Sequence, residues 1–170
     1  MQIRPATAAD ADAIAAIWSP IIRDTVITFW PTERSRADIA ALIAERRRDG
    51  FAFLVAIDGD EMTGFASTSQ FRVGAGYART LEHTVHVAEG QRGKGTGRAL
   101  MTAIQAHASA AGARVLIGAI TAGNRASVQF HARLGFAEWG RIPAAGWKFG
   151  RFHDLVLMGK DLGNNSAPVP

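Results

Sequence analysis

The sequence predicts a mixed α/β fold built around one central sheet. Two observations lead to this prediction. Apolar residues recur at helical spacing in four segments, and short apolar runs bounded by glycine or turn residues lie between them. The segments follow one another in the order β-α-α-β-β-β-α-β-α-β-β. A chain of 170 residues with 48% hydrophobic and 20% charged residues is long enough to bury a full core, and we expect a single soluble domain.

The first part of the chain predicts a short strand at residues 3–4 and two helices. Thr7 and Asp10 have the spacing of a capping box at the start of the first helix. Ser35 caps the second helix, and Gly50 ends it. Each helix has one apolar face, formed by Ile14, Ile17, Trp18 and Ile21 in the first and by Ile39, Leu42 and Ile43 in the second.

Three strands are expected next, over residues 51–57, 62–72 and 81–87. The first two are joined by the turn at residues 58–61, in which Gly59 can adopt a positive φ. The third strand ends at a glycine-rich segment. This arrangement predicts an antiparallel pair followed by a strand that leads directly into a loop.

A helix, a strand, a second helix and a strand pair complete the chain. We expect Leu100, Ile104 and His107 on the buried face of the first of these helices, and Asn124 as the cap of the second. The expected ranges are 95–111 for a helix closed by Gly112, 115–120 for a buried strand, 124–134 for a helix ended by Gly135, and 136–142 and 152–160 for the final strands.

Composition limits the classes of function. The net charge of +4 comes from arginines spread along the chain, so nucleic-acid binding is not indicated. Cysteine is absent, and His83 and His86 would point to opposite faces of a strand, so no metal site is expected. No apolar run approaches the ~20 residues of a membrane span, and we expect a cytoplasmic protein without membrane contact. Residues 163–170 are expected to form a flexible tail.

The segment between Glu89 and Leu100 has the composition of a phosphate-binding loop. Its glycines allow successive N–H groups to converge, and the following helix adds its positive dipole end. Neither a Walker loop nor a dinucleotide fingerprint fits the spacing, because Thr96 directly follows Gly95 and Leu100 stands where a third glycine is needed. The expected cofactor-binding residues of this loop are Arg92, Gly93, Lys94, Gly95, Thr96, Gly97 and Arg98.

The order of elements, the Arg92-x-x-Gly95-x-Gly97 loop and the helix that ends in Leu134-Gly135-Phe136 resemble the GNAT superfamily of N-acetyltransferases. The segments 82–87 and 145–154 are similar to those of the phosphinothricin acetyltransferase subgroup. The resemblance covers residues 1–162, which are expected to form one domain. It implies an α/β (α+β) fold with a mixed sheet of six to seven strands and about four helices, splayed between the fourth and fifth strands. It also implies a homodimer.

The resemblance implies acetyl-CoA as the cofactor. In the family the pantetheine arm pairs with the strand before the loop, which here carries over to the backbone of Val85, His86 and Val87. A backbone N–H near Val85 would then polarise the thioester carbonyl. Asn124 and Ser127 are expected to contact the cofactor. His131, on the same helix face, is either a structural residue or the acid that protonates the leaving thiolate.

The resemblance also suggests which residues bind and activate the acceptor. Glu82 is the expected general base, and burial would raise its pKa toward the range that amine deprotonation requires. Ala78 stands where relatives that acetylate methionine sulfone carry arginine, which puts the identity of the substrate in question. The expected substrate-binding residues are Phe29, Tyr77, Arg79, Thr80, Glu82 and Trp147.

The sequence therefore predicts an acetyl-CoA-dependent N-acetyltransferase acting by direct attack in a ternary complex. The expected acceptor is the α-amine of a small amino acid or amino-acid-like inhibitor, of the phosphinothricin, methionine sulfone or methionine sulfoximine type. Two alternatives remain open. One is a related enzyme that acetylates another small amine or a peptide N-terminus. The other is an acyl-CoA-binding sensor or a nucleic-acid-associated protein without the acceptor chemistry.

Overall fold

A seven-stranded sheet runs through the computed structural model, which describes residues 1–163. Residues 164–170 of the expected tail lie outside the described residues. The elements are β1 (Gln2–Pro5), η1 (Ala8–Asp10), α1 (Ala11–Asp24), α2 (Arg36–Arg48), β2 (Phe53–Asp58), β3 (Glu61–Gln70), η2 (Ala75–Tyr77), β4 (Thr80–Val87), α3 (Thr96–Ala110), β5 (Val115–Thr121), α4 (Arg125–Arg133), β6 (Ala137–Lys148) and β7 (Arg151–Asp161).

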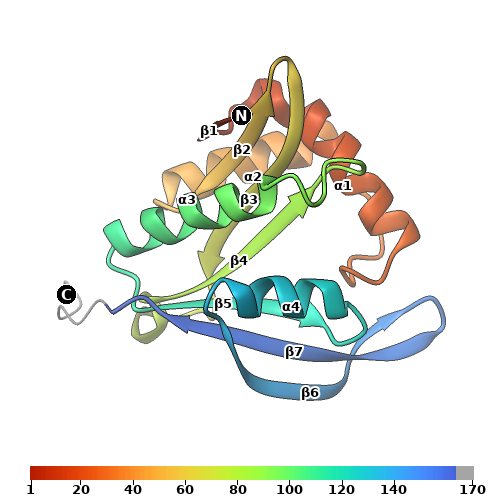
Figure 1. The fold of residues 1–170 in the computed structure, drawn as a ribbon, viewed down its shortest axis with the longest axis vertical. Helices are drawn as coiled ribbons and strands as arrows, with labels where there is room; N and C mark the ends of the chain where they lie inside the picture. Colours follow the sequence, from red (N-terminus) through yellow and green to blue (C-terminus); the bar gives the residue numbers. More distant parts are fainter. Residues whose placement is uncertain (164–170) are drawn as a thin grey trace.

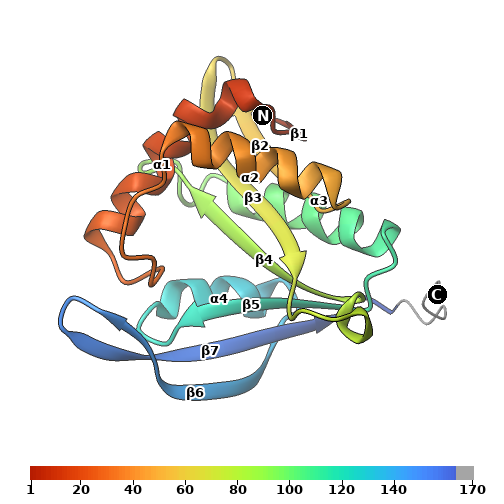
Figure 2. The same cartoon turned by 180° about the vertical axis from the view of Figure 1, so that it is seen from behind.

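The strand order is β1-β2-β3-β4-β5-β7-β6, and β4–β5 is the one parallel pair among the described strands. Helices α3 and α4 cover one face of the sheet (Figure 1). Helices α1 and α2 lie on the other face (Figure 2). The sheet is therefore mixed and flanked by four α-helices, as the sequence predicted.

Each face of the sheet has its own apolar core. Ile14 and Ile22 of α1 pack with Ile39 of α2 against Phe65 of β3, and all four side chains are almost fully buried. On the opposite face, Leu100, Met101 and Ile104 of α3 pack against Leu116, Val156 and Met158. Burial of this apolar surface is the dominant favourable contribution to folding.

The strands β4 and β5 separate halfway along β4. Their pairing covers Thr80–His83 and Val115–Gly118, whereas β4 remains paired with β3 as far as Val87. Figure 1 shows the two strands diverging from this point. The second half of β4 is thus open on the side of β5, which confirms the splay expected between the fourth and fifth strands.

Two details of the sequence prediction were wrong. His107 is exposed, and the buried face of α3 includes Met101 and Ala108 instead. The final strands are also longer than expected, because β6 continues to Lys148. The strand contains Pro143, which is tolerated because β6 is an edge strand whose register shifts between Ile142 and Gly146.

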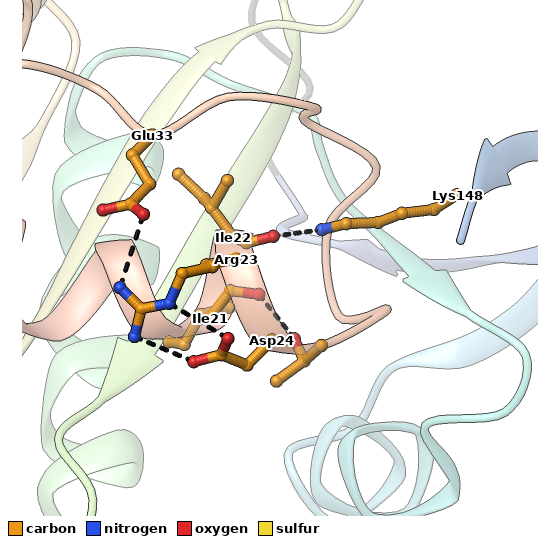
Figure 3. A network of polar contacts seen from close by, with 7 residues as sticks. Ile21, Ile22, Arg23, Asp24, Glu33 and Lys148 are labelled. Carbon is orange, nitrogen blue, oxygen red and sulfur yellow. Dashed lines mark hydrogen bonds and ion pairs between the residues drawn. The ribbon is translucent and has the colours of Figure 1, made fainter. Parts of the chain in front are cut away.

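Lys148, at the end of β6, connects the C-terminal hairpin to α1. Its Nζ donates hydrogen bonds to the carbonyls of Ile22, at 2.5 Å, and Thr28, at 2.8 Å. Figure 3 shows the side chain reaching the last turn of α1, beside the cluster formed by Arg23 with Asp24 and Glu33. A cation is favourable at a helix C-terminus, where carbonyls lack partners within the helix. The loop after α1 is therefore held against β6.

Candidate active site

The glycine-rich loop turns as its composition requires. Gly90, Gly93 and Gly95 have φ values of 77°, 80° and 93°, in the region where other residues are strained. Gly95 is the N-cap of α3. The loop therefore presents the free N–H groups of the α3 N-terminus, which is a favourable position for phosphate.

A groove of about 470 Å³ extends from this loop along the open half of β4. It lies between β4, the loop and α4. Most of the expected cofactor residues line it, namely Val85, His86, Val87, Arg92, Gly93, Gly95, Gly97, Arg98, Asn124 and Ser127. Gly97 allows α3 to approach α4, since a Cβ there would lie 3.2 Å from the ring of Phe130.

Two expected members of the loop do not line the groove. Thr96 is buried, and its methyl group lies 3.2 Å from the position of a Cβ at Gly64 of β3. Lys94 is exposed and donates a hydrogen bond to Gln91 at 3.1 Å. The side chain of Thr96 therefore packs against β3, and that of Lys94 lies on the surface of the loop.

A second cavity, also of about 470 Å³, lies between the loop after α1, the strand β4 and the strand β5. Phe29, Glu82, His83, Gly118 and His131 are among its lining residues. The two cavities share Ile27, Val85, His86, Asn124 and Ser127. They therefore meet where β4 separates from β5, and an extended ligand in the groove would end beside the second cavity.

Glu82 lines the second cavity and is half-buried. Desolvation raises the pKa of its carboxyl group above the ordinary value. No hydrogen bond or ion pair is found for this carboxylate among residues 1–163. A carboxylate with a raised pKa in a cavity has the properties of a general base.

His131 of α4 forms a buried pair with His83 of β4. The two Nε2 atoms are 2.9 Å apart, and His131 Nδ1 lies 2.7 Å from the carbonyl oxygen of Ser127. Desolvation lowers the pKa of both rings, that of His83 to about 3. His131 thus lines the second cavity but not the groove, where it was expected as a cofactor residue, and it faces a second histidine that we did not expect there.

His83 and His86 lie on opposite faces of β4, as their spacing predicted. His86 packs against Trp18 and Phe65, with ring centroids 6.0 Å and 5.3 Å away. Burial, with a smaller contribution from Arg92, lowers the pKa of His86 to about 4. In the described part of the chain, no group of three His, Asp or Glu side chains could hold a metal ion.

Phe29 and Glu82 are the expected substrate residues that the structure places in the second cavity. Tyr77 is 45% exposed and Trp147 is 58% exposed, and neither lines the cavity. Thr80 begins β4, away from its open half. Arg79 donates from Nε to the carbonyl of Gly112 at 2.6 Å, so it stabilises the connection after α3 and does not reach the cavity.

Sequence reasoning missed Arg34, which lies in the loop between α1 and α2. Its guanidinium carbon lies 4.3 Å from the ring centroid of Trp30 and 5.1 Å from that of Trp18, and both indoles line the second cavity. Arg34 Nε is buried without a hydrogen-bond partner. Hydrogen bonds from Ser35 lower the pKa of the nearby Asp38, and the charge of Arg34 adds a smaller lowering. Only the tertiary structure places this arginine beside the cavity.

The comparisons with known proteins agree with this geometry. Residues 16–136 match the model of the Acetyltransferase (GNAT) family. The L-methionine sulfoximine/L-methionine sulfone acetyltransferase of Pseudomonas aeruginosa is 40% identical over 168 residues, which cover 98% of each chain. The phosphinothricin N-acetyltransferase of Alcaligenes faecalis is 32% identical over 162 residues, which cover 95% of this chain and 82% of the relative.

A solved structure extends the similarity to the whole fold. The yncA protein of Salmonella typhimurium, solved with its cofactor acetyl-CoA, superposes with a TM-score of 0.94 at 32% identity. The match covers 99% of this chain and 98% of that one. The fold, the family match and the full-length relatives confirm the resemblance seen in the sequence: this chain belongs to the acetyltransferase (GNAT) family and is an N-acetyltransferase.

Proposed function

We propose that this protein transfers the acetyl group of acetyl-CoA to the α-amine of a small amino acid or amino-acid-like inhibitor. The proposed acceptors are phosphinothricin and the sulfone or sulfoximine of methionine. One observation carries the proposal: a groove beside a phosphate-binding loop meets a second cavity that contains a desolvated carboxylate, Glu82. Residues 1–162 carry both sites, and the cytoplasm, where acetyl-CoA is available, is the proposed location.

The groove is proposed to bind acetyl-CoA. Backbone N–H groups at the α3 N-terminus, with Arg92 and Arg98, would hold the pyrophosphate. The pantetheine arm would then lie along the open half of β4, as an added strand does at a sheet edge. Asn124 and Ser127, which line both cavities, would contact its distal end.

The reaction is proposed to proceed by direct attack in a ternary complex. Glu82 takes a proton from the substrate ammonium, directly or through water, and the amine attacks the thioester carbon. The backbone N–H of Val85 donates to the carbonyl oxygen as it becomes negative. The carbon–sulfur bond then breaks, and the thiolate takes a proton from water or from the Ser127–His131 side of the junction.

His131 acts in this proposal through Ser127. Its Nδ1 lies 3.4 Å from Ser127 Oγ, and Ser127 lines both cavities. A donor on this side of the junction would stabilise negative charge on the leaving sulfur. Nδ1 of His131, the nitrogen that faces Ser127, is therefore the one that bears on the leaving sulfur in the proposed reaction.

An amino-acid acceptor also needs a cation for its carboxylate. No lysine or arginine of the described residues lines the second cavity, and Arg79 is bonded elsewhere. We propose that Arg34 supplies the positive charge, because it lies between two indoles that line the cavity. A small shift of the exposed Trp30 would bring the guanidinium to the cavity edge.

The C-terminal hairpin is proposed to form a homodimer interface. Five large apolar side chains of β6, β7 and their turn are between 44% and 65% exposed, namely Trp139, Ile142, Trp147, Phe149 and Phe152. An edge strand with such side chains is open to association. Light scattering of wild type and of Phe152→Glu tests this: a dimer that the substitution converts to monomer is expected, and a monomeric wild type would contradict it.

A panel of amines assayed with acetyl-CoA, read by release of free thiol, tests the proposed function. Turnover is expected with phosphinothricin or with methionine sulfone or sulfoximine. Turnover confined to other amines or to peptide N-termini would overturn the proposed substrate class. Binding of acetyl-CoA without turnover on any acceptor would favour a sensor.

A further inference from the structure

The pair formed by His83 and His131 determines where the protons of both rings lie. His131 Nδ1 is 2.7 Å from the Ser127 carbonyl oxygen, which can only accept a hydrogen bond. Nδ1 of His131 therefore carries a proton. In the neutral ring, Nε2 of His131 is then a bare acceptor.

The contact between the two rings assigns the second proton. The Nε2 atoms are 2.9 Å apart, and a hydrogen bond at this distance needs one proton between them. Since Nε2 of His131 is bare, Nε2 of His83 must be the donor. This leaves Nδ1 of His83 without a proton, and that atom is buried without a hydrogen-bond partner.

The surroundings keep both rings in place and uncharged. His83 is 6% exposed and His131 is 2% exposed, and the ring of Phe136 packs against both. Gly118 of β5 makes room for the pair, since a Cβ there would lie 2.9 Å from His83 Cε1. Desolvation lowers the pKa of each ring, and mutual repulsion of the charged rings lowers that of His83 further.

No charged side chain neutralises a protonated pair. The charged residues on the elements around it are Glu82 on β4, Arg125 and Arg133 on α4, and Arg151, Asp154, Lys160 and Asp161 on β7. Lys160 Nζ lies 5.8 Å from the Phe136 centroid. Within residues 1–163, none of them forms a hydrogen bond or ion pair with either imidazole. Against desolvation and mutual repulsion, the backbone of Ile117 favours the charged form of His83.

We propose that His83 is a positioning residue that holds His131 as the neutral Nδ1–H tautomer. The donated hydrogen bond occupies Nε2 of His131, which therefore cannot take the proton of the substrate amine. It also directs the Nδ1–H of His131 toward Ser127, on the side of the leaving sulfur. What this tautomer does in catalysis rests on the proposed function, but the tautomer itself does not.

Proton transfer in the reaction then involves Glu82 and water, and not His131. Glu82 is left to receive the proton of the amine, because neither His131 nitrogen is available as an acceptor. His131 stays neutral throughout the reaction, so that of the two proton sources proposed above for the departing thiolate, water is the one that remains. Without His83, Nε2 of His131 would be free to bind a proton, and a charged His131 would form more readily.

Nitrogen-15 NMR of the imidazoles in the full chain tests the tautomer without any acceptor or cofactor. In the wild type, His131 is expected to show a protonated Nδ1 and a bare Nε2 between about pH 6 and 9. His83→Phe removes the donor, and the pKa of His131 is expected to rise. His83→Gln can still donate from its side-chain amide, and it should keep the wild-type pattern.

The two variants also separate positioning from packing. His83→Phe should lower kcat/KM by about tenfold near pH 6 and by less near pH 8, whereas His83→Gln should stay within about threefold of wild type at both. A wild-type His131 protonated on Nε2, or an unchanged His131 titration in His83→Phe, would overturn the proposal. If His83→Phe does not fold, the wild-type tautomer and the His83→Gln pattern still decide it. Failure of the acceptor assay would leave the NMR result unaffected.

Discussion

The ring of Phe29 lies directly over Gly146, so that a Cβ at Gly146 would be 2.2 Å from two ring carbons. Phe29 also stacks on His153, which is paired with Gly146 across the hairpin, with ring centroids 5.8 Å apart. The loop after α1 therefore reaches its position over the second cavity by packing on the β6–β7 hairpin. The shape of the proposed acceptor site thus depends on a glycine more than a hundred residues away in sequence.

Gly146→Ala should displace Phe29 from the cavity. Since the added methyl group cannot coexist with the ring, KM for the acceptor should rise by about tenfold, with little change in KM for acetyl-CoA. Gly140→Ala is the matched control, because it lies in the same strand and a Cβ there meets nothing within 4 Å. Equal acceptor KM values for the two variants would show that Phe29 does not shape the site.

Glu82→Gln should reduce kcat/KM by about 10²- to 10⁴-fold, because the amide cannot accept the proton of the amine. Only the ionised carboxylate is a base, so wild-type activity should rise with pH through the raised pKa of Glu82. This rise should be absent in the variant. A pH profile of kcat/KM for both proteins measures it, and wild-type rates in the variant would exclude Glu82 as the base.

The raised pKa of Glu82 should also make the folded protein less stable as pH rises, whereas activity is expected to increase with pH. A carboxyl group whose folded pKa is raised contributes stability below its unfolded pKa, and this contribution is lost as pH rises through the folded value. Glu82→Gln should therefore raise the free energy of unfolding near neutral pH relative to wild type. Urea denaturation at about pH 4 and pH 7.5 measures the difference, and a variant less stable at the higher pH would contradict burial of the charge.

Lys148→Met should destabilise the protein by about 1–3 kcal/mol, because the carbonyls of Ile22 and Thr28 lose their donor. The methionine keeps the length of the side chain, so lost packing is a minor part of the effect. Lys94→Met, at an exposed position, is expected to change the free energy of unfolding by less than about 0.5 kcal/mol. Equal unfolding midpoints of the two variants in urea would contradict this role of Lys148.

Arg34→Met should raise KM for an amino-acid acceptor by about tenfold and leave an acceptor without a carboxylate unaffected. Methionine preserves the apolar packing between Trp18 and Trp30 but removes the charge. Arg36→Met is a suitable control, since Arg36 forms an exposed ion pair with Asp12. A loss of the same size for both kinds of acceptor would mean that Arg34 supports the indoles and does not bind the carboxylate.

Local sequence determined the helices, strands and turns, because each of these elements depends on residues that are close to one another in the chain. The glycines at 90, 93 and 95 imply a loop with positive φ, and Asn124 caps α4 by accepting from Ser127 N at 3.2 Å. Alternation in β4 likewise predicted the opposite orientations of His83 and His86. The length of β6 could not be predicted, since a strand containing Pro143 is tolerated only at the sheet edge, and edge position is a property of the topology.

By itself the sequence determined the mixed α/β fold, the positive-φ turns of the glycine-rich loop and the family, because these depend on periodicity, capping and motif spacing. The tertiary structure decided which side chains surround the second cavity, the proposed acceptor site. It bonded Arg79 to Gly112, placed Arg34 between two indoles and paired His83 with His131. These relationships join residues from different elements, and their distances follow from sheet order and helix packing, which no local pattern encodes.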